Sequence, residues 1–185
     1  FHYGKTPPCS TKIIEAGIKR VVIGMKDPNS VVSGGGIKRL QEAGIEIKVG
    51  VKKEQAQNLN EIFIKYKTTP YPFIILKTAQ TLDGFLATSS GDSKWITNTK
   101  ARQRGHQLRH QVDAILVGIN TVLSDDPSLT TRLSDKEGRD SIRIILDSNL
   151  KLPPEAKIIN QTSSAPTLIV TGTDVNKTDL NKHES

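Results

Sequence analysis

The sequence is poor in several features that define whole classes of protein. It has one cysteine in 185 residues, which excludes an internal disulfide and fits a reducing compartment or a metal ligand. Aromatic residues make up 4% and are scattered, unlike the stacking surfaces of nucleic-acid-binding proteins. No apolar run approaches the roughly 20 residues of a membrane helix, and no apolar signal-peptide core stands at the start. These absences argue against a disulfide-rich scaffold, a membrane protein and a nucleic-acid-binding protein.

Positive charge is what the sequence has in excess. The formal net charge is +7 and the pI is about 9.5. A basic protein suits anionic partners such as phosphorylated metabolites, dinucleotides or nucleic acid, and a solvated basic surface is the alternative. The length suffices for one domain or two small ones. Phe1 in place of an initiator methionine indicates that the N-terminus has been lost or processed.

Residues 68–72 (TTPYP) are the expected link between two domains, 1–67 and 73–185, because the prolines block a helix and favour an extended chain. Hydrophobic periodicity on both sides predicts alternating strands and helices, which is typical of an α/β protein with parallel strands. The expected helices cover 10–16, 37–43, 55–66 and 99–111, with a turn or short helix at 118–123. The expected strands cover 20–25, 45–51, 73–76, 112–117, 142–146 and 166–171.

Two of these helices carry further expectations. Ser10 is expected to cap the first helix, which Gly17 ends. Cys9 then lies at a helix start, where the helix dipole favours the thiolate that a metal needs, although a structural cysteine is the commoner case. In the helix over 55–66, a stripe at helical spacing is expected to face the core. It consists of Leu59, Ile62, Phe63 and Tyr66.

The stretch 73–97 is the expected centre of a binding site. Phe73–Leu76 is predicted to be a buried strand, and Lys77 stands where it ends. Asp83 and Gly84 indicate a turn, which a small polar loop follows. Trp95, the only tryptophan, closes the stretch. A strand, a lysine, a turn, a loop and an aromatic lid form a frame for a charged planar ligand. The glycine run at 33–36, before an expected helix, could cradle a phosphate. It lacks the Walker lysine and the GxGxxG spacing, which favours a flexible connection.

Two sets of motifs resemble one known family in order and spacing. HYGKTPPC at 2–9 with DPN at 27–29 resembles the back half of the zinc deaminase domain of bifunctional riboflavin-biosynthesis deaminase/reductases. Lys77, LDG at 82–84, SKWIT at 93–97, Arg109 and TVLSDDP at 121–127 resemble the front half of the reductase domain. The resemblance runs from residue 1 to about 159. It implies the C-terminal half of a cytidine-deaminase-like α/β/α domain joined to the N-terminal half of a dihydrofolate-reductase-like domain.

For the deaminase half, the resemblance implies a zinc site of which this chain holds only Cys9. Such sites use one His, two Cys and a Glu. The family's pattern puts a further Pro-Cys pair directly before the position of Phe1 and His-Ala-Glu well upstream, and neither is in this sequence. The resemblance also implies that His2, Lys5 and Asn29 contact the ribose phosphate and the pyrimidine of the substrate. The alternative is that they decorate a surface loop.

For the reductase half, the resemblance implies reduction of 5-amino-6-(5-phosphoribosylamino)uracil with NADPH. Lys77 and Asp125 are the expected catalytic residues. Arg109 and Arg132 are expected to hold the phosphate, with Ser93 adding a neutral donor and Leu129 on the substrate side. The expected cofactor contacts are Ala79, Trp95, Thr121, Asp125 and Ser148. Each of these residues taken alone has an ordinary structural explanation, and only their joint occurrence favours a site.

The expected partner is a phosphorylated pyrimidine, with neither nucleic acid nor membrane, in a homo-oligomer that is cytoplasmic, or plastid in a plant. The family's glycine-rich turn for the NADPH phosphates is not found after Ser148, so an internal fragment spanning the domain junction is expected. The competing hypothesis is a catalytically inactive remnant that serves as a binding or oligomerisation module.

Overall fold

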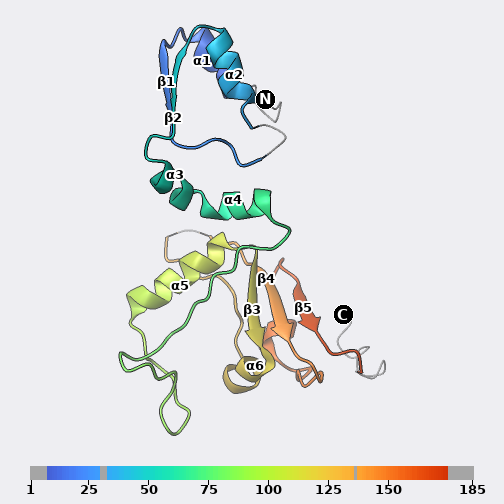
Figure 1. Ribbon diagram of the computed structural model, residues 1–185. Helices are drawn as coiled ribbons and strands as arrows, with labels where there is room; N and C mark the ends of the chain where they lie inside the picture. Colours follow the sequence, from blue (N-terminus) through green and yellow to red (C-terminus); the bar gives the residue numbers. More distant parts are fainter. Residues whose placement is uncertain (1–7, 30–32, 136, 175–185) are drawn as a thin grey trace. The chain divides into compact units, whose positions relative to one another are not determined.

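The computed structural model describes residues 8–29, 33–135 and 137–174. The chain divides into two compact units, Phe1–Lys77 and Thr78–Ser185, each of which is described by itself. Figure 1 labels all of their strands and most of their helices. Within the described ranges, no helix is long and apolar enough to cross a membrane.

The first unit is built on a pair of parallel strands. Its elements are, in order, α1 (Cys9–Glu15), β1 (Arg20–Ile23), α2 (Gly35–Glu42), β2 (Glu46–Val49), α3 (Lys53–Leu59) and α4 (Glu61–Thr68). Val21 lies opposite Ile47 in the ladder, and α2 makes the crossover that parallel strands need. The helix α2 contacts both α1 and β2, and Leu40 and Ile45 are buried there. The predicted strand–helix alternation is therefore confirmed in this unit.

Two expectations for the first unit are wrong. Ser10 does not cap α1, because the helix begins at Cys9 and Pro8 is its N-cap. Ser10 is instead buried inside the first turn. The helix expected over 55–66 is interrupted at Asn60, whose φ of −111° separates α3 from α4. That break divides the expected apolar stripe between two helices, and its members are exposed, Leu59 at 86% and Tyr66 at 72%.

The second unit is a three-stranded parallel sheet with three helices among its described residues. Its elements are α5 (Thr99–Gln111), β3 (Ala114–Gly118), α6 (Ile119–Asp125), β4 (Ile142–Leu146), α7 (Lys157–Asn160) and β5 (Thr167–Val170). The strand order is β3-β4-β5, as Figure 1 shows. Leu116 pairs with Ile144, and Ile144 with Leu168. The predicted α/β class with parallel strands is confirmed here as well.

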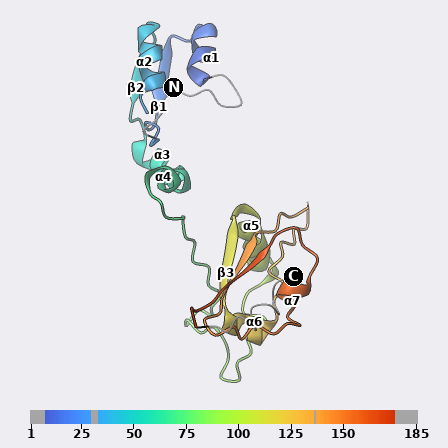
Figure 2. The ribbon, with the colours of Figure 1, turned by 90° about the vertical axis from the view of Figure 1, so that its right-hand side faces the viewer.

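One face of this sheet carries the core of the second unit. Ile145 of β4 is fully buried against Val122 of α6, Ile158 of α7 and the loop residue Leu152. Figure 2 brings α7 into view beside the sheet. The other face holds Leu116 and Leu168, which are about half exposed within the described part of the chain. The strands therefore alternate in burial, as period-two geometry requires.

The strand expected at Phe73–Leu76 is not formed. The segment is extended but is not paired with any strand in the part of the chain that is described, and Ile74 and Leu76 are 79% and 87% exposed. An extended segment becomes a strand only when its N–H and C=O groups meet a neighbouring strand, and β-branched composition supplies no such partner. The apolar pattern of this segment therefore predicted its extended backbone correctly, but the prediction that the segment is buried is wrong.

Candidate functional site

Arg109 and Arg132 meet at His106. His106 and Arg109 lie one turn apart on α5, and the Arg109 Nη1 atom is 3.4 Å from His106 Nδ1. The same Arg109 atom donates a hydrogen bond of 2.7 Å to the carbonyl of Thr130. The backbone N–H of Arg132 donates to His106 Nδ1 at 3.2 Å. Two of the residues expected at the substrate phosphate therefore lie together, joined by a histidine that the sequence analysis did not select.

This cluster carries positive charge with little compensation. Burial, and then the charge of Arg132, lower the pKa of Arg109, and Asp140 acts in the opposite direction. The ion pairs among the described residues include neither arginine. The buried Nε of Arg109 also has no hydrogen-bond partner there. Two neighbouring guanidinium groups without a carboxylate bridge form a site that favours an anion.

The surroundings of His106 favour the neutral ring. Burial is the largest cause that lowers its pKa, followed by the charges of Arg109 and Arg132, and the Thr130 carbonyl opposes them. Two N–H donors directed at Nδ1 require a lone pair on that atom. The hydrogen-bond network therefore assigns the ring proton to Nε2.

The segment that carries Arg132 is fixed by Asp140. The Asp140 carboxylate accepts from the backbone N–H of Thr131 at 2.7 Å and from the Ser163 hydroxyl at 2.8 Å. Gly138 packs on the same segment so closely that an added Cβ would lie 2.6 Å from Thr131 Cγ2. The hydroxyl of Ser141 donates to the Arg109 carbonyl at 2.6 Å, which ties the last turn of α5 to the start of β4.

A buried arginine connects this framework to the sheet. Arg143 of β4 is almost fully buried, and burial lowers its pKa. Its Nη1 donates to Ser163 at 3.0 Å and its Nε to the Thr167 hydroxyl at 2.8 Å, while Nη2 bonds the Ala165 carbonyl. Because Ser163 also holds Asp140, the position of the arginine cluster is coupled to the β4–β5 ladder.

Trp95 presents an exposed aromatic surface beside α5. It is 73% exposed, and the Arg102 guanidinium lies 4.4 Å from its ring centroid. Arg102 is itself held by the Thr97 carbonyl and by the Thr99 hydroxyl at 3.0 Å. Ser93 stands in the same loop, where its carbonyl accepts from Ile96 N–H. Because Arg102 precedes His106 by four residues, the Trp95 contact and the arginine cluster share one face of α5.

A second group of expected residues lies at the carboxyl ends of the strands. Thr121 and Asp125 belong to α6, which follows β3, and Ser148 follows β4. All three are exposed, and the Ser148 carbonyl accepts from Gly172 N–H at 3.0 Å. Ligands of open parallel sheets bind at this edge. The arginine cluster is instead tied to the amino end of β4 through Ser141.

The remaining reductase residues have separate environments. Lys77 is exposed and is the last residue of the first unit, whereas Ala79 is half-buried in the second. Leu129 has a φ of +52° and packs against the core of the second unit. Asp126, the neighbour of Asp125, accepts from the Lys157 backbone N–H at 2.9 Å and lies 3.2 Å from its ammonium. That backbone N–H is the main cause that lowers the pKa of Asp126.

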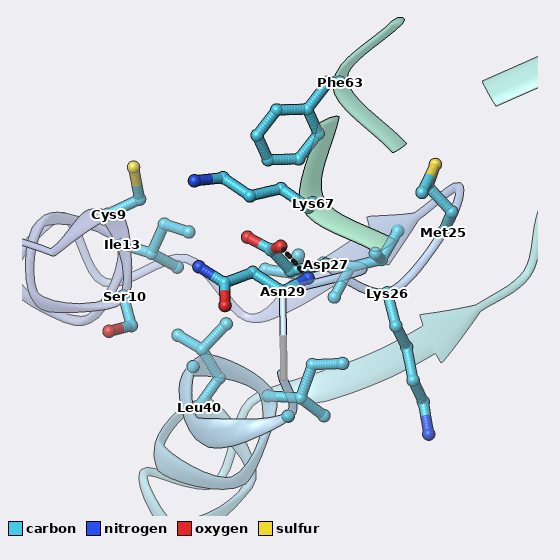
Figure 3. A pocket seen from close by; sticks show the side chains of 15 residues that line it. Cys9, Ser10, Ile13, Met25, Lys26, Asp27, Asn29, Leu40, Phe63 and Lys67 are labelled. Carbon is cyan, nitrogen blue, oxygen red and sulfur yellow. Dashed lines mark hydrogen bonds between the residues drawn. The ribbon is translucent and has the colours of Figure 1, made fainter. Parts of the chain in front are cut away.

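The first unit has a pocket of about 570 Å³ at the start of α1. Figure 3 shows Cys9 and Asn29 on its lining, with Phe63 and Lys67 of α4 also facing it. The N–H of Asn29 donates to Asp27 at 2.9 Å. The expected substrate contacts His2 and Lys5 lie outside the described residues.

Catalytic zinc requires three protein ligands, and the described donors do not supply them. Cys9 is the free thiol of the chain and is exposed. In the ranges that are described, no group of three His, Cys, Asp or Glu side chains could hold a metal ion. The residues described therefore do not fit a zinc site.

Comparisons with known proteins agree with this architecture. A riboflavin biosynthesis protein RibD of Aquifex aeolicus is 49% identical over 183 residues, 99% of this chain and 51% of the relative. The RibD of Escherichia coli is 43% identical over 86% of this chain and 47% of its own length. The chain thus spans about half the length of the curated relatives it matches.

Solved structures show the same fold. A crystal structure of a diaminohydroxyphosphoribosylaminopyrimidine deaminase/5-amino-6-(5-phosphoribosylamino)uracil reductase from Thermotoga maritima matches with a TM-score of 0.79 and 44% identity, over 96% of this chain and 50% of that chain. A structure of Acinetobacter baumannii RibD matches with a TM-score of 0.76 and 35% identity, over 98% of this chain and 51% of that one.

The family match also corrects the expected extent of the resemblance. The RibD C-terminal domain model matches residues 72–184, which includes the tail beyond residue 159 that the motifs did not reach. The match covers more than half of the chain and contains the arginine cluster, Trp95 and the whole β3-β4-β5 sheet. The chain therefore belongs to the RibD C-terminal domain family.

Proposed function

We propose that this chain is part of a riboflavin-biosynthesis enzyme that reduces 5-amino-6-(5-phosphoribosylamino)uracil to its ribitylamino product. The reaction is the one named for the reductase part of the Thermotoga maritima protein. The observation that carries the proposal is that the Arg109 side chain and the Arg132 backbone both meet His106, while neither guanidinium is in an ion pair among the described residues. A dianionic phosphate is the substrate group that such a pair holds best.

In this proposal the two arginines anchor the substrate at its phosphate. Guanidinium groups bind phosphate oxygens in a fixed geometry, which holds the sugar in one orientation. Ser93 adds a neutral hydroxyl, and Leu129 limits the room on the substrate side. The phosphate group is remote from the reacting carbon. The free energy of binding it can therefore be used to hold that carbon in the reactive geometry.

Reduction of the sugar carbon also needs a proton, and Asp125 is the residue proposed to hold and deliver it. Its carboxylate is exposed and makes no hydrogen bond or ion pair among the described residues, in contrast to that of Asp126. Lys77 is proposed to stabilise the charge that develops on the substrate. Both roles are proposals about the intact protein.

NADPH, when bound, supplies the hydride. The residues proposed to hold it fit a dinucleotide by their chemistry. Trp95 offers an exposed aromatic surface, fixed by Arg102, for a flat ring. The Thr121 and Ser148 hydroxyls lie at the strand ends where open parallel sheets bind nucleotides. The backbone of Ala79 and the Asp125 side chain complete the proposed set.

The other activity of the intact protein is proposed to be zinc-dependent deamination of the preceding pyrimidine. Cys9 would be the one zinc ligand from this chain, and His2, Lys5 and Asn29 are proposed substrate contacts. The first unit would then be the C-terminal half of a cytidine-deaminase-like domain and the second the N-terminal half of a dihydrofolate-reductase-like domain. A homo-oligomer is proposed for the intact protein.

The test uses the full-length protein that contains this chain. NADPH oxidation is followed by absorbance with the phosphorylated substrate, for the wild type and for Arg132→Ala and Arg104→Ala variants. Arg104 is the matched control, because it is an exposed arginine of α5 whose side-chain hydrogen bond among the described residues goes to Gln107, at 3.4 Å. We expect wild-type turnover, a KM increase of about tenfold or more for Arg132→Ala, and an unchanged KM for the control. Failure of the wild type to oxidise NADPH would leave the inactive binding module as the better explanation.

A further inference from the structure

His106 and Arg109 together anchor the loop of the arginine cluster to α5, His106 through the Arg132 N–H and Arg109 through the Thr130 carbonyl. The Nδ1 atom of His106 faces the Arg109 guanidinium on α5 and accepts from the Arg132 backbone N–H on that loop. The loop has a second anchor at Thr131, where Asp140 accepts its N–H at 2.7 Å. The backbone N–H groups of Arg132 and of the residue before it are therefore both bound, the first from α5 and the second from the segment before β4.

The hydrogen-bond pattern requires an acceptor at Nδ1, and a neutral histidine with its proton on Nε2 supplies one. A protonated ring would direct an N–H at the N–H of Arg132. It would also add a third positive charge beside the two arginines. The environment acts in the same sense, because burial and both arginines disfavour the charged ring.

We propose that His106 is a positioning residue that sets the separation and orientation of Arg109 and Arg132 for phosphate. It acts through the two arginines and does not touch the reacting atoms. This inference rests on the proposed function in assigning the arginine pair to the substrate phosphate, and it adds a residue that the motifs did not indicate.

His110 provides an internal comparison one turn further along α5. Its Nδ1 also accepts a backbone N–H, that of Arg139, at 2.9 Å. The Arg139 guanidinium is directed away to the Val112 carbonyl at 3.0 Å and to Asp113 at 3.5 Å. The arginine beside His110 therefore forms an ion pair with a carboxylate, whereas the two beside His106 form none among the described residues. Both histidines join α5 to the loop between α6 and β4. Of the two, His106 is the one whose Nδ1 lies beside Arg109 and Arg132.

The test compares His106→Leu, His106→Asn and His110→Leu in the full-length protein. Asparagine keeps an acceptor near the place of Nδ1 and leucine removes it. We expect His106→Leu to raise the KM for the phosphorylated substrate about tenfold while kcat stays within about twofold, since one hydrogen bond near a charged group is lost. His106→Asn is expected to restore KM to within about threefold of the wild type, and His110→Leu to leave it unchanged.

The same variants are assayed with the riboside that lacks the phosphate, and their binding of inorganic phosphate is measured by calorimetry. The proposal requires that His106→Leu weakens phosphate binding and leaves the KM for the unphosphorylated riboside unchanged. It is overturned if the KM rises equally for both substrates, if His110→Leu has the same effect, or if the wild type does not bind phosphate. A further outcome separates the two proposals. If the wild type lacks turnover but binds phosphate more tightly than His106→Leu does, the positioning role of His106 is supported and the proposed function is refuted.

Discussion

The carboxylate of Asp126 receives both the backbone N–H and the ammonium group of Lys157, at 2.9 and 3.2 Å. This contact fixes the end of α6 to the start of α7, whose Ile158 is fully buried in the core. Asp125, one residue earlier, is left with its carboxylate exposed. Two adjacent acidic residues are thus divided between a structural contact and a side chain available for chemistry.

Exchanging each of these carboxylates for an amide should separate the two roles. Asp125→Asn is expected to lower kcat for NADPH-dependent reduction by about a hundredfold or more, with the melting temperature unchanged. Asp126→Asn is expected to lower the melting temperature, because the charge facing Lys157 is lost, with kcat retained. Steady-state kinetics and calorimetry of the two variants decide the matter. Equal loss of kcat in both would contradict the assignment of Asp125.

Gly138 should tolerate no side chain. A Cβ there would lie 2.6 Å from Thr131 Cγ2 and 2.9 Å from the Thr131 carbonyl oxygen. Gly138→Ala is therefore expected to displace Thr131 and the neighbouring Arg132, with a loss of about 1–3 kcal/mol in the free energy of unfolding and a higher KM for the phosphorylated substrate.

Gly105→Ala is the matched control for that substitution. Gly105 lies inside α5 with open space around it. Alanine is the better helix former, so the free energy of unfolding is expected to rise by about 1 kcal/mol. Denaturant unfolding measures both variants, and a Gly138→Ala protein as stable as the wild type would show that the loop is not held as described.

Removal of the Arg102 guanidinium should affect the cofactor and not the phosphate. Arg102 lies 4.4 Å from the centroid of the Trp95 ring and is the contact that fixes this exposed aromatic. Arg102→Ala is expected to raise the KM for NADPH by about two- to fivefold, the range of a cation–π contact. The KM for the phosphorylated pyrimidine should stay constant. Arg104→Ala, on the same helix, serves as the control, and a similar rise there would refute the Trp95 assignment.

The contribution of His106 to stability should depend on pH with a defined sign. Burial, and then Arg109 and Arg132, lower its pKa from the ordinary 6.5, against a smaller effect of the Thr130 carbonyl. The unfolded chain therefore takes up a proton near pH 6.5 before the folded protein does. The contribution of His106 to the free energy of unfolding is therefore fully present above that pH. It decreases as the pH falls toward the lower pKa of the folded state.

The measurement for His106 is the difference in unfolding free energy between the wild type and His106→Asn. It is taken from urea unfolding at about pH 7.5 and about pH 5.5, on either side of the transition. Subtraction removes the common titration of the carboxylates. The advantage of the wild type should shrink at the lower pH, and an advantage that stays constant or grows would mean that the folded pKa is not lowered.

The elements that the local pattern predicted best are those whose ends are marked by residues within or next to the element. The helix over 99–111 has Asn98 as its cap, with the Asn98 side chain accepting from Ala101 N–H at 2.9 Å. The strand over 142–146 is a β-branched run with alternating burial. Both were predicted with the observed bounds. The short helix α7 has no helix-length periodicity, and its Ile158 is held by tertiary burial, so no local signal indicated it.

The candidate site was predictable in its arginines and not in its histidine. Arg109 and Arg132 were named through the family motifs, whereas His106 belongs to none of them. The spacing of His106, one turn before Arg109 on a predicted helix, was the signal that could have found it. What that spacing could not show is that the loop residue Arg132 would return to the same ring nitrogen.

The sequence by itself determined the α/β class, the elements with strong periodicity and the basic charge, because these depend on residue type and on near neighbours along the chain. Tertiary structure alone decided three things. It left Phe73–Leu76 extended but unpaired in the described part of the chain. It assigned Asp126 to Lys157 and left Asp125 exposed, and it brought two arginines 23 residues apart to one imidazole. Each of these depends on a partner distant in sequence, and a residue's own side chain carries no information about which distant group will face it.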